Sequence, residues 1–175
     1  MKILVTFVLI LFNYVLQTTL INRLSIFGVV PDVGIAFIVS IAILNGVFSG
    51  GAAGFVYGLI TGIFFGFSKA STVFYLFEYT AVGAIAGLLY PKTENKVFIR
   101  PMLFAGGGYL LKELIDIIPK LVLRIPVFTL PLLMILILGS LYTAVIMFPV
   151  HNLTERLHRF RFMRLENDTR IFLEK

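Results

Sequence analysis

Apolar residues run in six long stretches along the chain, separated by short polar or proline-containing connections. The stretches cover residues 3–21, 33–46, 49–67, 73–90, 101–118 and 130–148. An α-helix needs roughly 20 apolar residues to cross a bilayer, and most of the stretches approach that length. The pattern predicts an all-α, polytopic integral membrane protein in which six transmembrane helices form one bundle. This bundle would occupy residues 1–149 as a single domain, followed by a tail at 150–175.

Glycine recurs at every fourth position through the third stretch. Positions four apart lie on one ridge of a helix, so this spacing leaves a smooth groove against which another helix can pack closely. Small residues commonly bring helices together in lipid. The groove either packs within the chain or receives a partner's helix, and a second small-residue face occurs in the fourth stretch. The residues concerned are Gly46, Gly50, Gly54, Gly58, Gly62 and Gly66, and then Gly83 and Gly87.

Proline and glycine mark the expected ends of the helices. Pro31 and Asp32 suit the first turn of the second helix, because proline loses no hydrogen bond there and a carboxylate meets the positive end of the helix dipole. We therefore interpret Asp32 as a helix-start residue rather than a functional acid. The Asn45-Gly46 pair predicts a tight turn, so that the second and third helices form an antiparallel hairpin. Pro149 is expected to end the sixth helix.

The fifth stretch carries charged residues near its end. Lys112 and Asp116 are four positions apart and can pair on one helix face. A loop is expected to begin at Pro119 and to lead into the sixth helix.

Composition supports the membrane prediction and excludes several functions. Hydrophobic residues make up 59% of the chain, charged residues only 14%, and mean hydropathy is +0.99, outside the range of soluble globular domains. The absence of cysteine excludes disulfides and thiolate metal sites. The two histidines, His151 and His158, lie in the tail, which argues against a histidine-based catalytic or metal site within the membrane.

The distribution of basic residues predicts the orientation. Ten of the 15 lysines and arginines fall on the side that holds both termini, and the other five fall on the opposite side. The positive-inside rule places both termini in the cytoplasm. Much of the net charge of +6 lies in the tail, where apolar and basic residues alternate. We interpret this segment as attracted to anionic lipids, not to nucleic acid. Its apolar positions are Leu153, Leu157, Phe160 and Phe162, and its basic ones Arg156, Arg159, Arg161 and Arg164.

A search for chemistry finds no catalytic set. The glycine-rich segment lacks the spacing and the lysine of a phosphate-binding loop and lies in an apolar helix. Glu78 is the one acid expected at membrane depth, where ionisable residues are functional candidates by default. Its role is either structural, including partner contact, or that of a substrate or proton site. We therefore expect a protein that is not an enzyme and that uses no metal or other cofactor.

Three segments resemble the rod shape-determining protein MreD family. They are LQTTLINRLSIFGVVPD (16–32), GFVYGLITGIFFG (54–66) and EYTAVGAIAGLL (78–89). That family has a Gln near the end of its first helix, a Pro-Asp or Pro-Asn pair opening the second, a Gly-Phe-x-x-Gly-Leu core in the third and a Gly-rich fourth. The residues that match are Gln17, Pro31, Asp32, Gly54, Phe55, Gly58, Leu59 and Gly87. Many members carry an acid in the third helix where this chain has Thr61.

The resemblance implies a non-enzymatic component of the bacterial inner membrane, in the machinery of cell elongation and peptidoglycan synthesis. Members of this family are expected to bind MreC, which has one transmembrane helix and a periplasmic domain. They are also expected to work with the actin-like MreB, the glycosyltransferase RodA and a class B penicillin-binding protein. In this interpretation the MreC helix lies on the Gly50–Gly66 ridge or on the Gly83 and Gly87 face.

The alternative is the substrate-binding S component of an energy-coupling-factor vitamin transporter, which is similar in architecture. Such components contact their coupling subunit through small residues on the first helix, and residues 3–21 here contain neither alanine nor glycine. A ligand pocket also needs polar groups that converge. The candidates Asn45, Tyr57, Thr61 and Glu78 do not form a recognisable set in the sequence.

Overall fold

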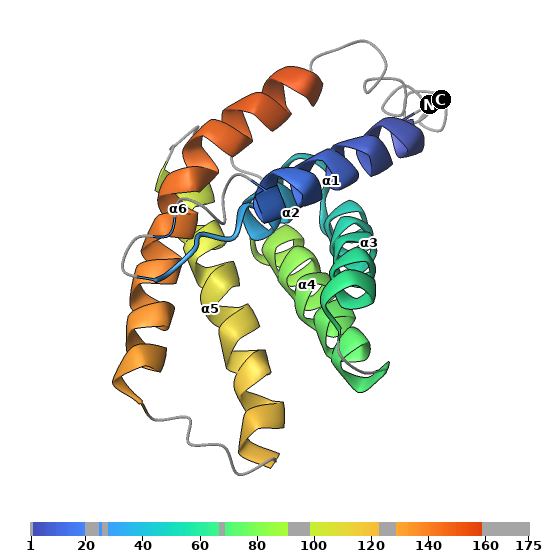
Figure 1. Cartoon of the computed structure of the whole chain (residues 1–175). Coiled ribbons are helices and arrows are strands. Elements are labelled where there is room, and N and C mark those ends of the chain that lie inside the picture. Colours follow the sequence, from blue (N-terminus) through green and yellow to red (C-terminus); the bar gives the residue numbers. More distant parts are fainter. Residues whose placement is uncertain are drawn as a thin grey trace, which may run out of the picture.

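The computed structural model describes residues 2–19, 25, 28–66, 69–90, 99–122 and 129–158, and these form an all-helical bundle. The helices found there are α1 (Lys2–Thr19), α2 (Val33–Asn45), α3 (Val47–Phe65), α4 (Lys69–Leu89), α5 (Ile99–Val122) and α6 (Leu130–His158). Each contains most of one predicted apolar stretch, and α5 and α6 continue beyond the ends of theirs. The predicted all-α bundle is confirmed (Figure 1).

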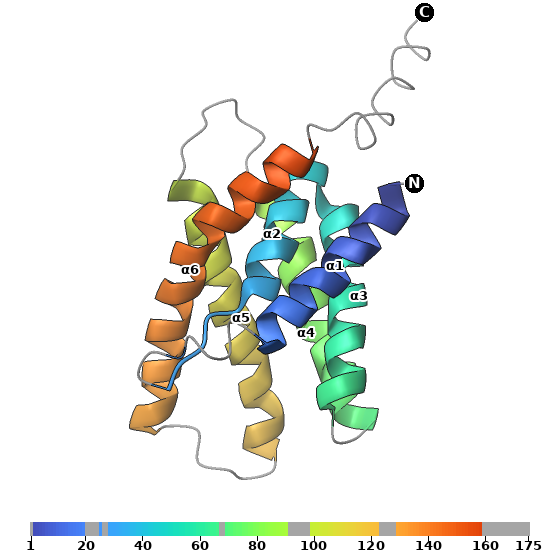
Figure 2. The ribbon, with the colours of Figure 1, turned by 45° about the horizontal axis from the view of Figure 1, so that its top comes forward.

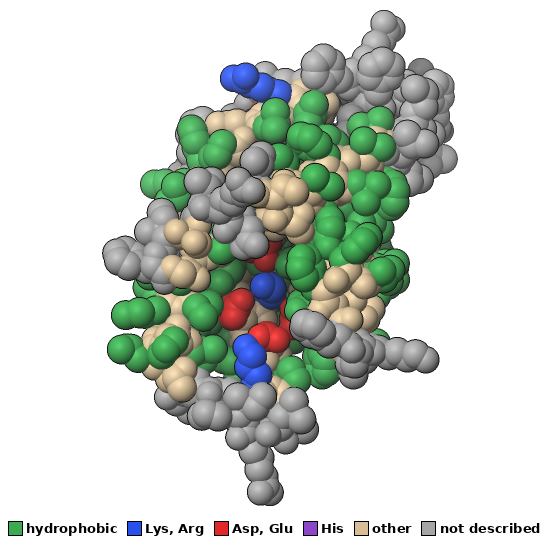
Figure 3. Space-filling view, viewed as in Figure 1, with side chains coloured by type: hydrophobic (Ala, Val, Ile, Leu, Met, Phe, Trp, Pro, Cys, Tyr) green, Lys and Arg blue, Asp and Glu red, His purple; other side chains and the backbone are tan. Residues whose placement is uncertain are grey.

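Among the residues that the structure describes, three helices are long and apolar enough to cross a membrane. They are α3, the Ser71–Leu89 part of α4, and α6. Two further apolar segments, Val5–Thr19 and Val33–Asn45, are shorter. The outer surface agrees, because large apolar side chains on several helices point away from the bundle. Phe48 is 93% exposed and Phe64 71%, and Figure 3 shows how hydrophobic side chains dominate this face of the molecule.

Helix α2 is the centre of the bundle. It packs against α1, α3, α4, α5 and α6, and residues 33–42 are all buried. Its sequence is apolar around its whole circumference, which is typical of a helix enclosed by others. Figure 1 shows α3 and α4 on one side of α2 and α5 and α6 on the other, with α1 lying across them.

Gly46 alone joins α2 to α3. Its backbone has φ of 87°, which is accessible to glycine and strained for other residues, and its N–H donates to the carbonyl of Ala42. One residue is enough to reverse the chain, so α2 and α3 run antiparallel (Figure 2), as the Asn45-Gly46 pair predicted.

The glycine ridge of α3 lies directly against α4. A Cβ added at Gly58 would be 2.6 Å from the carbonyl oxygen of Tyr75 and 2.8 Å from the Cα of Leu76. Gly50, Gly54 and Gly62 face the α4 backbone in the same way. On the α4 side, Gly83 faces Gly50 and Gly87 faces Val47. The glycine groove therefore packs within the chain, against α4, and not against the helix of a partner. A partner helix cannot lie on the ridge while α4 lies there.

Two of the expected helix ends are wrong. Helix α5 continues through Pro119 to Val122, and α6 continues through Pro149 to His158. A proline removes one backbone hydrogen bond but does not end a helix that neighbouring contacts support. Beyond Pro149, His151 Nδ1 is 2.9 Å from Ser40 Oγ, and His158 Nε2 is 2.7 Å from Asn45 Oδ1. Figure 2 shows this part of α6 leaning over α2.

Part of the tail predicted to contact lipid is therefore helical. Arg156 lies on the last turn of α6 and is exposed, as is Leu153 one turn before it. Arg159, Arg161 and Arg164 lie outside the described residues, so their contact with anionic lipids stays a prediction.

Candidate functional site

An ion pair inside the bundle joins α2 to α5. Lys112 Nζ lies 3.4 Å from Asp32 Oδ2 and 3.4 Å from Glu113 Oε1. The side chain of Lys112 is 17% exposed and that of Asp32 8%. Figure 3 shows acidic and basic side chains together in a hollow of an otherwise hydrophobic face. Charges held away from water need several partners, because desolvation opposes their burial.

Asp32 has more partners than a helix start requires. Its Oδ1 accepts from the Ile35 N–H at 3.0 Å, which confirms the prediction that it begins α2. Its Oδ2 accepts from the Tyr79 hydroxyl at 2.9 Å, and its backbone N–H donates to Thr143 Oγ1 at 3.1 Å. This one residue thus ties α2 to α4, α5 and α6.

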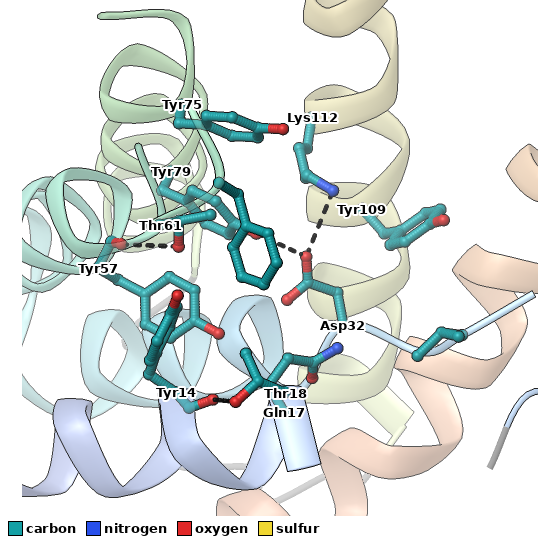
Figure 4. Close-up of a pocket in the computed structure, with 12 residues that line it drawn as sticks. Tyr14, Gln17, Thr18, Asp32, Tyr57, Thr61, Tyr75, Tyr79, Tyr109 and Lys112 are labelled. Carbon is teal, nitrogen blue, oxygen red and sulfur yellow. Dashed lines mark hydrogen bonds and ion pairs between the residues drawn. The ribbon is translucent and has the colours of Figure 1, made fainter. Parts of the chain in front are cut away.

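Lys112 does not pair with Asp116, although the spacing allows that pair. Asp116 pairs instead with Lys120, one turn further along α5. Lys112 points towards the start of α2 (Figure 4), where Asp32 and the Tyr79 and Tyr109 rings surround it. Spacing along one helix allows a local pair, but the tertiary contact determines the partner.

Gln17 connects the end of α1 to the start of α2. Its Nε2 donates to the Pro31 carbonyl at 3.0 Å, and its Oε1 accepts from the Val33 N–H at 2.8 Å. The amide thus satisfies one acceptor and one donor of the backbone on either side of Asp32. These contacts bring Gln17, Pro31 and Asp32 into one hydrogen-bonded junction.

Replacing Gln17 with leucine should destabilise this junction by about 1–3 kcal/mol, because two partly buried backbone groups lose their partner. Thr19→Val is the matched control, since the Thr19 hydroxyl donates only to the Val15 carbonyl of its own exposed helix face. Thermal unfolding of the two purified variants measures the difference. Equal unfolding temperatures would contradict the role given to Gln17.

A cavity of about 360 Å³ lies beside the Asp32–Lys112 pair. Figure 4 shows its wall, which comes from α1, α3, α4 and α5 and from the segment that leads into α2. Five of the seven tyrosines of the chain line it. The polar or aromatic residues of the wall are Tyr14, Gln17, Thr18, Asp32, Tyr57, Thr61, Phe65, Tyr75, Tyr79, Tyr109 and Lys112.

Two glycines leave space in which tyrosine rings of this wall pack against the backbone. The Tyr57 ring lies where a Cβ of Gly34 would be, and the Tyr109 ring lies where a Cβ of Gly139 would be. The Tyr57 and Tyr79 rings also meet edge to face with centroids 4.9 Å apart. The rings are therefore positioned by packing rather than left to rotate.

Comparisons with protein-family models, with curated proteins and with solved structures found no match. Sequence and geometry therefore carry the functional argument.

Glu78 lies on α4 beside the tyrosines of the cavity. It is 1% exposed, and its Oε2 has no hydrogen-bond partner among the described residues. It follows Tyr75 by three positions and precedes Tyr79, so all three lie on neighbouring turns of one helix. Among all the described residues, no group of three acidic or histidine side chains is close enough together to hold a metal ion.

The structure separates the residues that the sequence singled out. Tyr57 and Thr61 line the cavity, whereas Asn45 lies at the other end of α2, beside His158. Phe55 and Leu59 point outwards from α3 and are partly exposed. Sequence reasoning missed the cavity because no pattern in the sequence brought Lys112 together with Asp32. The remaining tyrosines of the wall, Tyr14, Tyr75, Tyr79 and Tyr109, gave no spacing signal because they come from three helices.

Proposed function

We propose that this chain is a non-enzymatic scaffold of the MreD type, which binds MreC in the bacterial inner membrane. The observation that supports this proposal is the junction of Gln17, Pro31 and Asp32, where three residues of the MreD-like pattern are hydrogen-bonded or adjacent. A pattern whose members meet in space is more informative than one of scattered positions, because the fold requires all of them together.

In this proposal all six helices lie in the membrane, including the shorter α1 and α2. Helix α2, with 13 residues, is about 20 Å long and does not cross a hydrocarbon core of about 30 Å by itself. Its enclosure by the other helices removes the need for contact with lipid along its length. The start of α1 and the end of α6 lie at the same end of the bundle (Figure 2), which is compatible with two cytoplasmic termini.

We place the MreC helix on the outward face of α3 rather than on its glycine ridge, which α4 covers. Phe55 and Leu59 belong to the MreD-like pattern, yet they are 46% and 37% exposed. Ala52 and Ile63 continue the same outward face. Residues of the pattern that internal packing leaves exposed are the best candidates for contact with a partner.

Mild-detergent purification of the tagged protein from its native host should recover an MreC-like protein, with or without RodA, MreB and a penicillin-binding protein. Phe55→Ala combined with Leu59→Ala should reduce recovery of MreC at least severalfold. The matched control is Phe77→Ala with Leu88→Ala on the outward face of α4, where both side chains are exposed. A double variant that retains MreC as well as the control does would exclude the α3 face, and absence of MreC from the unaltered protein would exclude the scaffold.

The cavity favours a second candidate, a substrate-binding component similar to the S components of energy-coupling-factor transporters. A volume of about 360 Å³ lies within the range of small-molecule sites, about 300–1,000 Å³. Recovery of a coupling subunit with its ATPases in the same purification would support this candidate and contradict the scaffold.

A further inference from the structure

The cavity contains a cation that is already neutralised. Lys112 is its basic residue, and its ammonium contacts the carboxylates of both Asp32 and Glu113. A bound anion would have to compete with these two carboxylates for a single ammonium. The electrostatics of the site therefore disfavour an anionic ligand.

Two carboxylates contact Lys112, the cation of the cavity wall, and one of them, that of Asp32, lines the cavity itself. Asp32 and Glu113 share the single ammonium of Lys112, so this group of three side chains carries a net negative charge. Asp116 and Lys120 pair with each other and leave this balance unchanged. Surplus acidic groups away from water destabilise a fold unless a positive charge offsets them. A cationic ligand would supply that charge.

The aromatic wall suits the same kind of ligand. The Lys112 ammonium lies 5.8 Å from the centroid of the Tyr79 ring and 5.6 Å from that of Tyr109. Tyr14, Tyr57 and Tyr75 line other parts of the wall (Figure 4). Ring faces attract organic cations through their quadrupole, and tyrosine cages are a known way to bind quaternary ammonium groups.

We propose that this cavity binds a small organic cation, an amine or quaternary ammonium compound with an apolar body. Its charge lies against the Tyr57 and Tyr75 rings, which Lys112 does not cover, and its apolar part fills the space towards Tyr14 and Phe65. The proposal concerns the cavity alone and holds whether the chain is a scaffold or a transporter component.

Thermal unfolding of the purified full chain in detergent tests the proposal with defined probes. Benzyltrimethylammonium or choline at millimolar concentration should raise the unfolding temperature in a saturable way, because a ligand that binds only the folded state stabilises it. The neutral isostere of choline, 3,3-dimethyl-1-butanol, should give no comparable shift. Benzoate, an anion, should also fail to stabilise the protein.

Variants of the wall locate the binding. Tyr75→Leu should weaken the apparent affinity for the cation about tenfold, and Glu113→Gln should weaken it in the same direction. Tyr142→Leu is the matched control, since Tyr142 lies on α6 outside the cavity wall. The proposal is overturned if no cation gives a saturable shift, if the neutral isostere or benzoate stabilises as well as choline, or if Tyr75→Leu and Tyr142→Leu bind alike.

Discussion

Replacing Lys112 with methionine should lower the free energy of unfolding by about 3–5 kcal/mol, because it leaves the Asp32 and Glu113 carboxylates without their cation. Methionine has a similar length and apolar stem, so the change removes the charge with little change in packing. For a chain of this size, each kcal/mol corresponds to roughly 2–4 °C in unfolding temperature. Heating a fluorescent fusion and measuring the surviving folded peak by size-exclusion chromatography gives that temperature.

Lys120→Met is the control for this prediction. Lys120 pairs with Asp116, and both side chains are more than a third exposed. Pairs of this kind contribute about 0–1 kcal/mol. Adding Asp32→Asn to Lys112→Met should recover part of the lost stability, since the unpaired carboxylate is then removed. If Lys112→Met unfolds at the same temperature as Lys120→Met, the central role of the ion pair is wrong.

Replacing Gly58 with alanine should destabilise the bundle by about 1–3 kcal/mol through overpacking. The added methyl group would meet the backbone of Tyr75 and Leu76, at 2.6 and 2.8 Å. Backbone atoms cannot rotate away as a side chain does, so α3 and α4 must separate. The better helix propensity of alanine, about 1 kcal/mol, offsets only part of this cost.

Gly51→Ala separates the effect of crowding from that of helix propensity. Gly51 lies on the same helix, but a Cβ there would be 3.8 Å from the Ala84 Cβ, an ordinary contact. This variant should be as stable as the original protein or more stable. The same chromatographic measurement compares the two variants, and a Gly58→Ala protein that is no less stable than Gly51→Ala would show that α3 and α4 do not pack as described.

The helices themselves are predictable from sequence because their signals are local. Apolar stretches locate the helices, and all but the one at 33–46 approach bilayer length. The four-residue spacing of glycine identifies a close-packing ridge on α3. Which helix packs against that ridge cannot be predicted from local sequence. Gly58 faces α4 because the next helix along the chain returns beside α3, and no pattern within α3 distinguishes its own α4 from a helix of another protein.

The candidate site was not predictable for the same reason. Sequence rules correctly assign Asp32 to the start of a helix. For Lys112 they offer a plausible partner four residues away. The actual contact of Asp32 with Lys112 joins helices far apart in sequence, and local spacing carries no information about it. The proline rule failed at Pro149 in a similar way, because hydrogen bonds that His151 shares with Ser40 and His158 shares with Asn45 support the helix beyond it.

The position of α2 has a consequence for biogenesis. It is synthesised second, yet its polar groups find their partners on helices that are made much later. The backbone N–H of Asp32 donates to Thr143. The Ser40 hydroxyl forms a hydrogen bond with His151, and the Asn45 side chain forms one with His158. A nascent chain that has not yet released α6 therefore holds a short central helix with these groups unsatisfied. We therefore expect the core to assemble late, only after the last helix has been made.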